Sequence, residues 1–119
     1  MWTYEQLTGR LLHNGSLIGT GYSGHGDGLN NPSMQNVEGI GPLPRGRYTI
    51  GARYHHPILG PCTMNLAPAP GNQMFGRSLF RIHGDNPDGN HTASDGCIVL
   101  GPSIREAVDA CPDRDLTVV

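Results

Sequence analysis

Apolar and polar residues alternate along several short segments of the chain, which is the pattern of half-buried β-strands. RYTIG (47–51) alternates, and SLFRIHG (78–84), CIVLG (97–101) and DLTVV (115–119), which closes the chain, also have the residue types of strands. Glycine, proline and polar residues that favour turns flank these segments. We therefore predict short strands at these four places.

The first 24 residues have the pattern of a strand meander. TYEQ (3–6) and RLLH (10–13) flank a turn, and the strand SLIGTGYSG (16–24) follows. Asn14 and Gly15 separate the last two strands. This pair favours a type I′ hairpin turn, in which both central residues need a positive φ.

Two long stretches rich in glycine, asparagine and proline interrupt the strand pattern. They are residues 24–46 and 55–76. Stretches of this kind predict loops, and loops of this length in a compact domain are usually functional or mobile.

Residues 102–110, PSIREAVDA, predict the one clear helix of the chain. Pro102 suits the first helical turn, and Ser103 with Glu106 predicts a capping box. The order of elements is therefore mainly β with one short C-terminal helix. We predict a small β-sandwich or barrel, in one domain that spans residues 1–119.

Composition agrees with this fold class and excludes several functions. The 119 residues suit one core, and 18 glycines and 10 prolines fit short strands joined by many turns. The formal net charge is -2 and no basic run occurs, so nucleic-acid binding has little electrostatic support. All eight cationic side chains are arginines, which excludes a Schiff-base lysine, a Ser–Lys dyad and a Walker-type phosphate loop.

The N-terminal segment MWTYEQLTGR has neither the basic nor the apolar region of a secretory signal peptide. No apolar run approaches the ~18 residues of a membrane span. The sequence thus predicts a protein that is made in the cytoplasm without a signal peptide and does not insert into a membrane.

Three cysteines are present, Cys62, Cys97 and Cys111, and no C-x-x-C pair occurs. A structural zinc site is therefore not expected. We interpret Cys62 and Cys111 as small buried side chains, with a disulfide between them as the alternative in an oxidising compartment. In both cases Cys97 stays free.

The predicted strand SLFRIHG sorts its side chains between two faces. Phe80 and Ile82 point to the core, whereas Arg81, His83 and Asp85 point the other way. A histidine on the polar face, at a strand end marked by glycine, is placed for chemistry rather than for packing. From spacing alone, a surface histidine without a functional role stays open.

Cys97 opens the next strand directly after the tight turn SDG (94–96). Gly96 has no side chain, so a substrate carbonyl can approach the sulfur of Cys97 closely. Nearby backbone amides can then point at a developing oxyanion. His83 beside Cys97 would form a thiolate–imidazolium pair and lower the thiol pKa well below its free value of about 8.5. A core cysteine is the alternative from spacing alone.

These residues resemble a known family. FRIHG (80–84) followed by SDGCI (94–98) resembles the L,D-transpeptidase signature, a His-Gly and then Ser/Thr-His-Gly-Cys. GTGYSG (19–24), GPLPRGRYTI (41–50) and RDLTVV (114–119) resemble further elements of that fold. More closely, nearly the whole chain is similar to the compact L,D-transpeptidase-like effectors of bacterial type VI secretion.

The resemblance implies a small β domain of L,D-transpeptidase type and a cysteine enzyme that acts on peptidoglycan stem peptides. Cys97 is then the nucleophile that attacks the diaminopimelate carbonyl and expels D-alanine, and His83 is the base. The carbonyl of Gly84 orients the imidazole, and Gly96 with Cys97 supplies oxyanion amides. Water as acceptor gives L,D-carboxypeptidase activity, and an amine gives D-amino acid exchange or cross-linking. No cofactor or metal is implied.

The same resemblance implies an antibacterial effector. Its partners would be peptidoglycan stem peptides, the type VI secretion machinery and a cognate immunity protein. It would act in the periplasm of a target bacterium.

Several residues around the pair are candidates for binding substrate. Ser94 keeps the Ser/Thr of the signature and either bonds within the turn or touches substrate. Tyr22 and Ser23 are placed to line the cleft, and His91 lies in the loop between the catalytic residues. His25 in the preceding glycine-rich loop is interpreted mainly as a loop residue.

Arg81 completes the set, because its planar guanidinium suits a substrate carboxylate. An ion pair with an acid such as Asp85 is the alternative.

Two positions depart from the signature: Asp95 replaces a histidine, and Val99 stands where an asparagine is frequent. A carboxylate aimed at the sulfur would raise the thiol pKa, so we expect Asp95 to turn away.

Two other functions stay open. A zinc peptidase would use His83 and His91 with Cys97 or Asp85, although no His-x-His or His-Glu-x-x-His pair occurs. A non-catalytic cell-wall-binding module would tolerate Cys97→Ala. Sensitivity to chelators against sensitivity to thiol alkylators separates the zinc enzyme from the cysteine enzyme.

Overall fold

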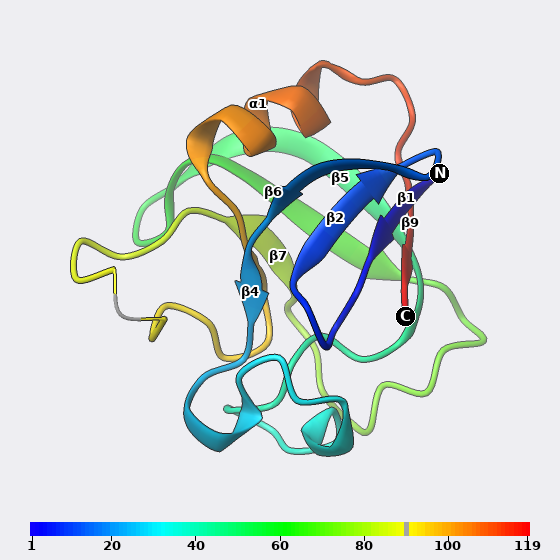
Figure 1. Cartoon of the computed structure of the whole chain (residues 1–119), viewed down its shortest axis with the longest axis vertical. Coiled ribbons are helices and arrows are strands. Elements are labelled where there is room, and N and C mark those ends of the chain that lie inside the picture. Colours follow the sequence, from blue (N-terminus) through cyan, green and yellow to red (C-terminus); the bar gives the residue numbers. More distant parts are fainter. Residues whose placement is uncertain (90) are drawn as a thin grey trace.

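In the computed structural model, which describes residues 1–89 and 91–119, nine strands form one sheet and a single α-helix lies near the C-terminus (Figure 1). The helix α1 spans Pro102–Ala110, and two 3-10 turns, η1 (Gly26–Gly28) and η2 (Pro32–Met34), follow the fourth strand. The predicted mainly β fold with one short C-terminal helix is confirmed. The strands are β1 (Trp2–Tyr4), β2 (Arg10–His13), β3 (Ser16–Thr20), β4 (Tyr22–Ser23), β5 (Gly46–His56), β6 (Gly60–Pro68), β7 (Arg81–His83), β8 (Ile98–Val99) and β9 (Asp115–Val118).

The sheet curls until its two edges meet. Its strand order is β3-β2-β1-β9-β5-β6-β7-β8-β4, so β3 and β4 are the outer strands. Yet these two strands follow one another in the chain, separated by Gly21 alone. The chain can pass from one edge to the other within one residue only if the sheet bends round on itself, as in the predicted barrel. Gly21 allows the close approach, because a Cβ there would lie 1.9 Å from the carbonyl oxygen of Val99.

The hairpin between β2 and β3 turns as its sequence predicts. Asn14 has a φ of 48° and Gly15 a φ of 85°, the two positive values that a type I′ turn requires. β1 and β2 pair antiparallel before it, so the N-terminal meander is present.

A strand occupies part of the second predicted loop, so that prediction is wrong there. β6 pairs with β5 on one side and with β7 on the other, which makes it a central strand. Two register shifts interrupt the β5–β6 ladder, and Cys62 within β6 has a φ of 54°. These irregularities break the alternation of apolar and polar residues, which is why the pattern does not reveal the strand.

Helix α1 begins without the predicted capping box. Its N-cap is Gly101, which makes no side-chain cap hydrogen bond, and Pro102 occupies the first turn, so Ser103 already lies inside the helix. Glu106 instead accepts a hydrogen bond of 2.7 Å from Arg53 of β5. Packing holds the helix on the sheet, since Val108 is part of the core. No helix among the described residues is long and apolar enough to cross a membrane.

The apolar core joins both ends of the chain to the central strands. Phe80 and Ile82 belong to it, as their places in the strand pattern predict. The other buried members are Trp2, Tyr4, Leu11, Leu43, Tyr48, Ile50, Cys62, Met64, Leu66, Ile98, Leu100, Val108, Leu116 and Val118.

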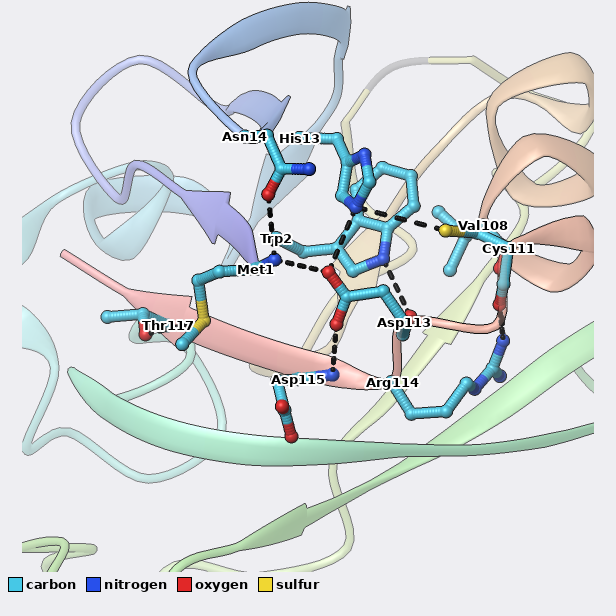
Figure 2. A network of polar contacts seen from close by, with 10 residues as sticks. All are labelled: Met1, Trp2, His13, Asn14, Val108, Cys111, Asp113, Arg114, Asp115 and Thr117. Carbon is cyan, nitrogen blue, oxygen red and sulfur yellow. Dashed lines mark hydrogen bonds and ion pairs between the residues drawn. The ribbon is translucent and has the colours of Figure 1, made fainter.

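A polar network ties β1 to β9, which run parallel (Figure 2). The carboxylate of Asp113, just before β9, accepts hydrogen bonds from the backbone nitrogens of Met1 and Asp115. It also lies 2.9 Å from His13 Nε2. These partners, the Met1 ammonium first, hold the pKa of Asp113 far below its ordinary value. The first and last strands are thereby fastened together on the side of the sheet that ends at β3.

Candidate active site

His83, the last residue of β7, is almost fully buried, with 2% of its surface exposed. Its Nδ1 lies 2.7 Å from the carbonyl oxygen of Gly84. A carbonyl oxygen can only accept, so Nδ1 carries the hydrogen and Nε2 of the neutral ring keeps its lone pair. The contact that the family resemblance implies for Gly84 is present, and it selects the tautomer that a general base needs.

Arg105 of α1 lies against this residue pair. Its guanidinium is buried and donates to the carbonyl oxygens of Leu100 at 3.0 Å and Pro61 at 2.7 Å. A Cβ on Gly84 would lie 2.8 Å from Arg105 Nη2, so the glycine makes room for the arginine. Burial foremost, and then the nearby arginine charges, lower the pKa of His83. The imidazole is therefore neutral near pH 7.

Cys97 directly precedes β8, the strand that pairs with the strand of His83. β7 and β8 pair in parallel, with His83 opposite Val99. Two residues earlier, the same register puts Cys97 opposite Arg81, on the face that carries His83. The sulfur is half-buried and 3.9 Å from the carbonyl oxygen of Leu79. By this register, the thiol and the imidazole project from the same face, offset by two residues along the strands.

The Cys97 thiol is neutral in this environment. Burial is the largest influence and raises the pKa of Cys97, and the Asp95 carboxylate acts in the same direction. The backbone N–H and charge of Arg81 and the charge of Arg77 oppose this rise. Because burial disfavours the charged form of both partners, thiol and imidazole rest as a neutral pair. Burial thus favours the neutral pair over the thiolate–imidazolium pair that the sequence predicts.

The neutral pair predicts slow alkylation of Cys97 at neutral pH. Since the folded thiol has a raised pKa, its reaction with iodoacetamide should accelerate through a midpoint above the free-thiol value of about 8.5. Mass spectrometry of the labelled peptides across a pH series gives this midpoint, with the Cys111 peptide as an internal comparison. A midpoint below about 8.5 would instead show that His83 holds the proton in the resting protein.

The turn before Cys97 is held by Ser94, which is fully buried. Its hydroxyl donates to the Cys97 carbonyl at 2.6 Å and accepts from the N–H groups of Gly24 at 2.9 Å and Gly96 at 3.1 Å. A hydroxyl can donate one hydrogen bond and accept two, so these three bonds leave none for a substrate. Ser94 therefore holds the turn. The Gly96 N–H cannot take the predicted oxyanion role either, because it donates to the Ser94 hydroxyl. The Cys97 N–H remains the candidate donor.

Ser23 is also structural, so its predicted place in the cleft is wrong. It is buried, donates to the Gly96 carbonyl at 3.0 Å and accepts from the Leu43 N–H at 2.8 Å. Gly96 itself has a φ of 136°, and a Cβ there would lie 2.5 Å from Arg77 Nη2 and 2.7 Å from Phe80 Cε1. The missing side chain therefore makes room for buried neighbours rather than for a substrate carbonyl.

Tyr22 and His91 lie together beside the site. Their rings meet edge to face, with centroids 4.9 Å apart. The Tyr22 hydroxyl donates to Asp85 Oδ1 at 2.7 Å and accepts from the Ala93 N–H at 3.1 Å. Burial, followed by the bond to Asp85, raises the pKa of Tyr22 to about 12. Both rings line a hollow of about 280 Å³ together with Asp85 and Val99, and their contact with substrate stays a prediction.

The guanidinium of Arg81 acts on the Cys97 thiol and forms no ion pair with a carboxylate among the described residues. Its Nε donates to the Tyr54 hydroxyl at 3.1 Å and its Nη1 to the Leu79 carbonyl at 3.4 Å. None of the ion pairs among residues 1–89 and 91–119 includes Arg81. The alternative of an ion pair with Asp85 is therefore wrong. Arg81 lines a hollow of about 220 Å³ with Leu79 and neighbouring residues of β6.

Asp95, which replaces the signature histidine, turns outward as expected. Its side chain is 83% exposed, and its Oδ1 lies 3.5 Å from His25 Nδ1. The same His25 nitrogen is 2.8 Å from the Ser94 carbonyl oxygen. His25 thus packs against the nucleophile turn from the glycine-rich loop.

Within the described part of the chain, no group of three His, Cys, Asp or Glu side chains is arranged to hold a metal ion. The zinc set considered from the sequence, His83 and His91 with Cys97 or Asp85, is not assembled. Cys62 and Cys111 are free thiols, so the disulfide alternative is not formed either.

Three residues of the site are not identified by the sequence analysis: Tyr54, Arg77 and Arg105. Tyr54 comes from β5, Arg77 from the segment before β7, and Arg105 from α1. These three residues reach the site only because β5, β6 and β7 pair with one another and α1 packs against the sheet. No local pattern in the sequence marks them.

Comparison with known proteins adds an independent result. A sequence model of a protein family, described as the Tlde1 domain, matches residues 18–110. The matched segment is most of the chain and contains every residue of the site described above. Among curated proteins, the search finds no match.

Proposed function

The chain belongs to the Tlde1-domain family of type VI secretion effectors, and on this premise we propose that it is a cysteine enzyme of peptidoglycan. Its activity is L,D-carboxypeptidase cleavage and L,D-transpeptidase exchange on stem peptides. The reaction passes through a thioester on Cys97. An antibacterial effector gains directly from such chemistry, because stem peptides carry the cross-links of the wall.

The arrangement of Cys97 and His83 is the observation that supports this proposal. The register of β7 and β8, extended by one residue to Cys97, puts both side chains on one face, and the Nδ1 of His83 lies 2.7 Å from the Gly84 carbonyl oxygen, which favours the tautomer with Nδ1 protonated. The neutral imidazole can therefore accept a proton on Nε2, and the neutral thiol has one to give.

The first half-reaction transfers the acyl group to sulfur. As Cys97 Sγ attacks the diaminopimelate carbonyl, its proton moves to His83 Nε2 and the carbonyl oxygen becomes an oxyanion. In this proposal the Cys97 N–H donates a hydrogen bond to that oxyanion. When the intermediate collapses, the C–N bond breaks and His83 returns the proton to the leaving amine of D-alanine.

The second half-reaction frees the enzyme. His83 takes a proton from water or from an acceptor amine, which attacks the thioester carbonyl. The C–S bond breaks, and His83 protonates the sulfur to restore the neutral pair. Arg81 would hold a carboxylate of the substrate, since its charge is not paired with a protein carboxylate among the described residues.

The proposed place of action is the periplasm of a target bacterium. Stem peptides of the mature wall lie there, and secretion into target cells is the context of the family. A cognate immunity protein in the producing cell is the expected partner.

The test is mass spectrometry of muropeptides incubated with the purified protein. Tetrapeptide stems should lose D-alanine, and added D-amino acids should appear in its place. Iodoacetamide treatment at alkaline pH should abolish both products, whereas EDTA should leave them unchanged. Loss of activity on chelation, restored by zinc, would favour the zinc peptidase. No product under any condition would favour the binding module.

A further inference from the structure

Arg77, in the segment that leads into β7, is a buried cation, with 6% of its surface exposed. Its guanidinium has no carboxylate partner among the ion pairs of the described residues. Instead it donates four hydrogen bonds to backbone carbonyls. Nη1 bonds Gln35 at 2.6 Å and Pro42 at 2.8 Å, and Nη2 bonds Gly41 at 3.0 Å and Asp95 at 3.1 Å.

These acceptors belong to two segments that are distant in sequence. Three of them lie in the loop 35–42, and the fourth, Asp95, lies two residues before Cys97. Arg77 therefore fastens the turn that carries the nucleophile to the loop that follows η2. The guanidinium also lies over the Phe80 ring, with Cζ 5.2 Å from the ring centroid. This cation–π contact adds to the hydrogen bonds that hold the guanidinium in place.

Gly96 shows how closely the guanidinium fits the turn. A Cβ at this residue would lie 2.5 Å from Arg77 Nη2, so only glycine leaves the space that the clamp occupies. On the other side, the Ser94 hydroxyl bonds the Cys97 carbonyl at 2.6 Å. The turn is thus held from both sides, and the direction of the Cys97 side chain follows from it.

The charges that face the Cys97 sulfur come from several elements. Arg77 and Arg81 favour the negative form of the sulfur, whereas Asp95 opposes it. His83 of β7 is neutral at rest. Arg77 thus has two means of acting on Cys97, through its bond to the turn and through its charge.

We propose that Arg77 is a positioning residue of the reaction: its guanidinium clamps the nucleophile turn against the loop 35–42 and so sets the direction in which the Cys97 sulfur attacks. This inference rests on the proposed role of Cys97 as nucleophile. A clamp of this kind needs the planar fork of arginine, because four carbonyls in two segments must be bonded at once.

The test compares Arg77→Lys and Arg77→Met with Arg114→Lys as matched control. Arg114 also donates to four backbone carbonyls, those of Ile50, Gly51, Val108 and Cys111. Its acceptors lie in β5 and around α1 rather than in the nucleophile turn. Each variant is assayed for kcat and KM on tetrapeptide stems, for iodoacetamide reactivity of Cys97 against pH, and for Tm.

Loss of the clamp should act on kcat. Arg77→Lys should lower kcat about ten- to hundredfold with little change in KM, because a misdirected nucleophile reacts slowly once the substrate is bound. Arg77→Met should also move the midpoint of alkylation to higher pH, since it removes a positive charge near the sulfur. Arg114→Lys should lower Tm while kcat and the alkylation profile stay unchanged.

A lowered Tm with unchanged kcat and unchanged alkylation in both Arg77 variants would overturn the inference. If these variants do not fold, Arg77→Gln carries the same test, because its neutral amide can donate only part of the four hydrogen bonds. If the wild-type protein shows no turnover, the proposed function fails. The alkylation profiles then still decide whether Arg77 controls Cys97.

Discussion

Replacing Cys97 by alanine is expected to abolish D-alanine release from tetrapeptide stems, with kcat lowered by about 10³-fold or more. The alanine has no sulfur to form the thioester, and neither Cys62, which is buried in the core, nor Cys111, at the C-terminal end of α1, lies on the nucleophile turn. His83→Ala should lower kcat by about 10²–10⁴-fold, because the proton of a neutral thiol then has no acceptor. Chromatographic quantification of released D-alanine measures both rates.

The double variant should be little worse than either single variant. Residues that act as one catalytic unit are not additive, since the second loss removes a step that has already failed. Cys111→Ala and His55→Ala are matched controls: Cys111 lies at the end of α1, and His55 is an exposed residue of β5. Normal turnover by Cys97→Ala, with these controls also active, would rule out the cysteine mechanism.

Arg81→Lys is expected to lower kcat/KM on tetrapeptide stems about ten- to hundredfold. Lysine keeps the charge but loses the planar fork, and a hydrogen bond between charged groups contributes about 1.5–3 kcal/mol. The available charge of Arg81 and its place opposite Cys97 motivate this expectation. Tyr54→Phe should give a smaller loss, because the Tyr54 hydroxyl orients the guanidinium from 3.1 Å.

Arg53→Lys is the matched control for Arg81. Its guanidinium bonds Glu106 at 2.7 Å and Asp109 at 3.3 Å on α1, so it serves the fold and should leave kcat/KM unchanged. Steady-state kinetics and Tm are measured on all three variants. Unchanged kinetics with a lowered Tm in Arg81→Lys would mean that Arg81 is structural.

Local rules account for the parts of this fold that the sequence predicts well. The turn at Asn14 and Gly15 needs only the tolerance of two residues for positive φ. The opposite faces of Ile82 and His83 follow from the period of a strand. Such features depend on neighbours in the chain, so the pattern of residues is sufficient to find them.

The residue pattern does not predict the central strand β6, and the reason is physical. Its ladder with β5 contains two register shifts, and Cys62 adopts a positive φ. Each register shift changes the face to which the following residues point, so the apolar and polar residues of β6 do not follow one regular alternation. Its identity as a strand is therefore clear only from its pairing with β5 and β7 in the folded sheet.

Two features of the site can be predicted from local sequence alone: a histidine at the end of one strand, and a cysteine directly after the turn SDG. Tertiary structure decided what each of them can do. Burial set the neutral state of Cys97 and His83, and partners from other segments used up the hydroxyls of Ser94 and Ser23. The solvation of a charge and the occupancy of a hydrogen-bonding group depend on atoms brought together by folding, and no local pattern contains them.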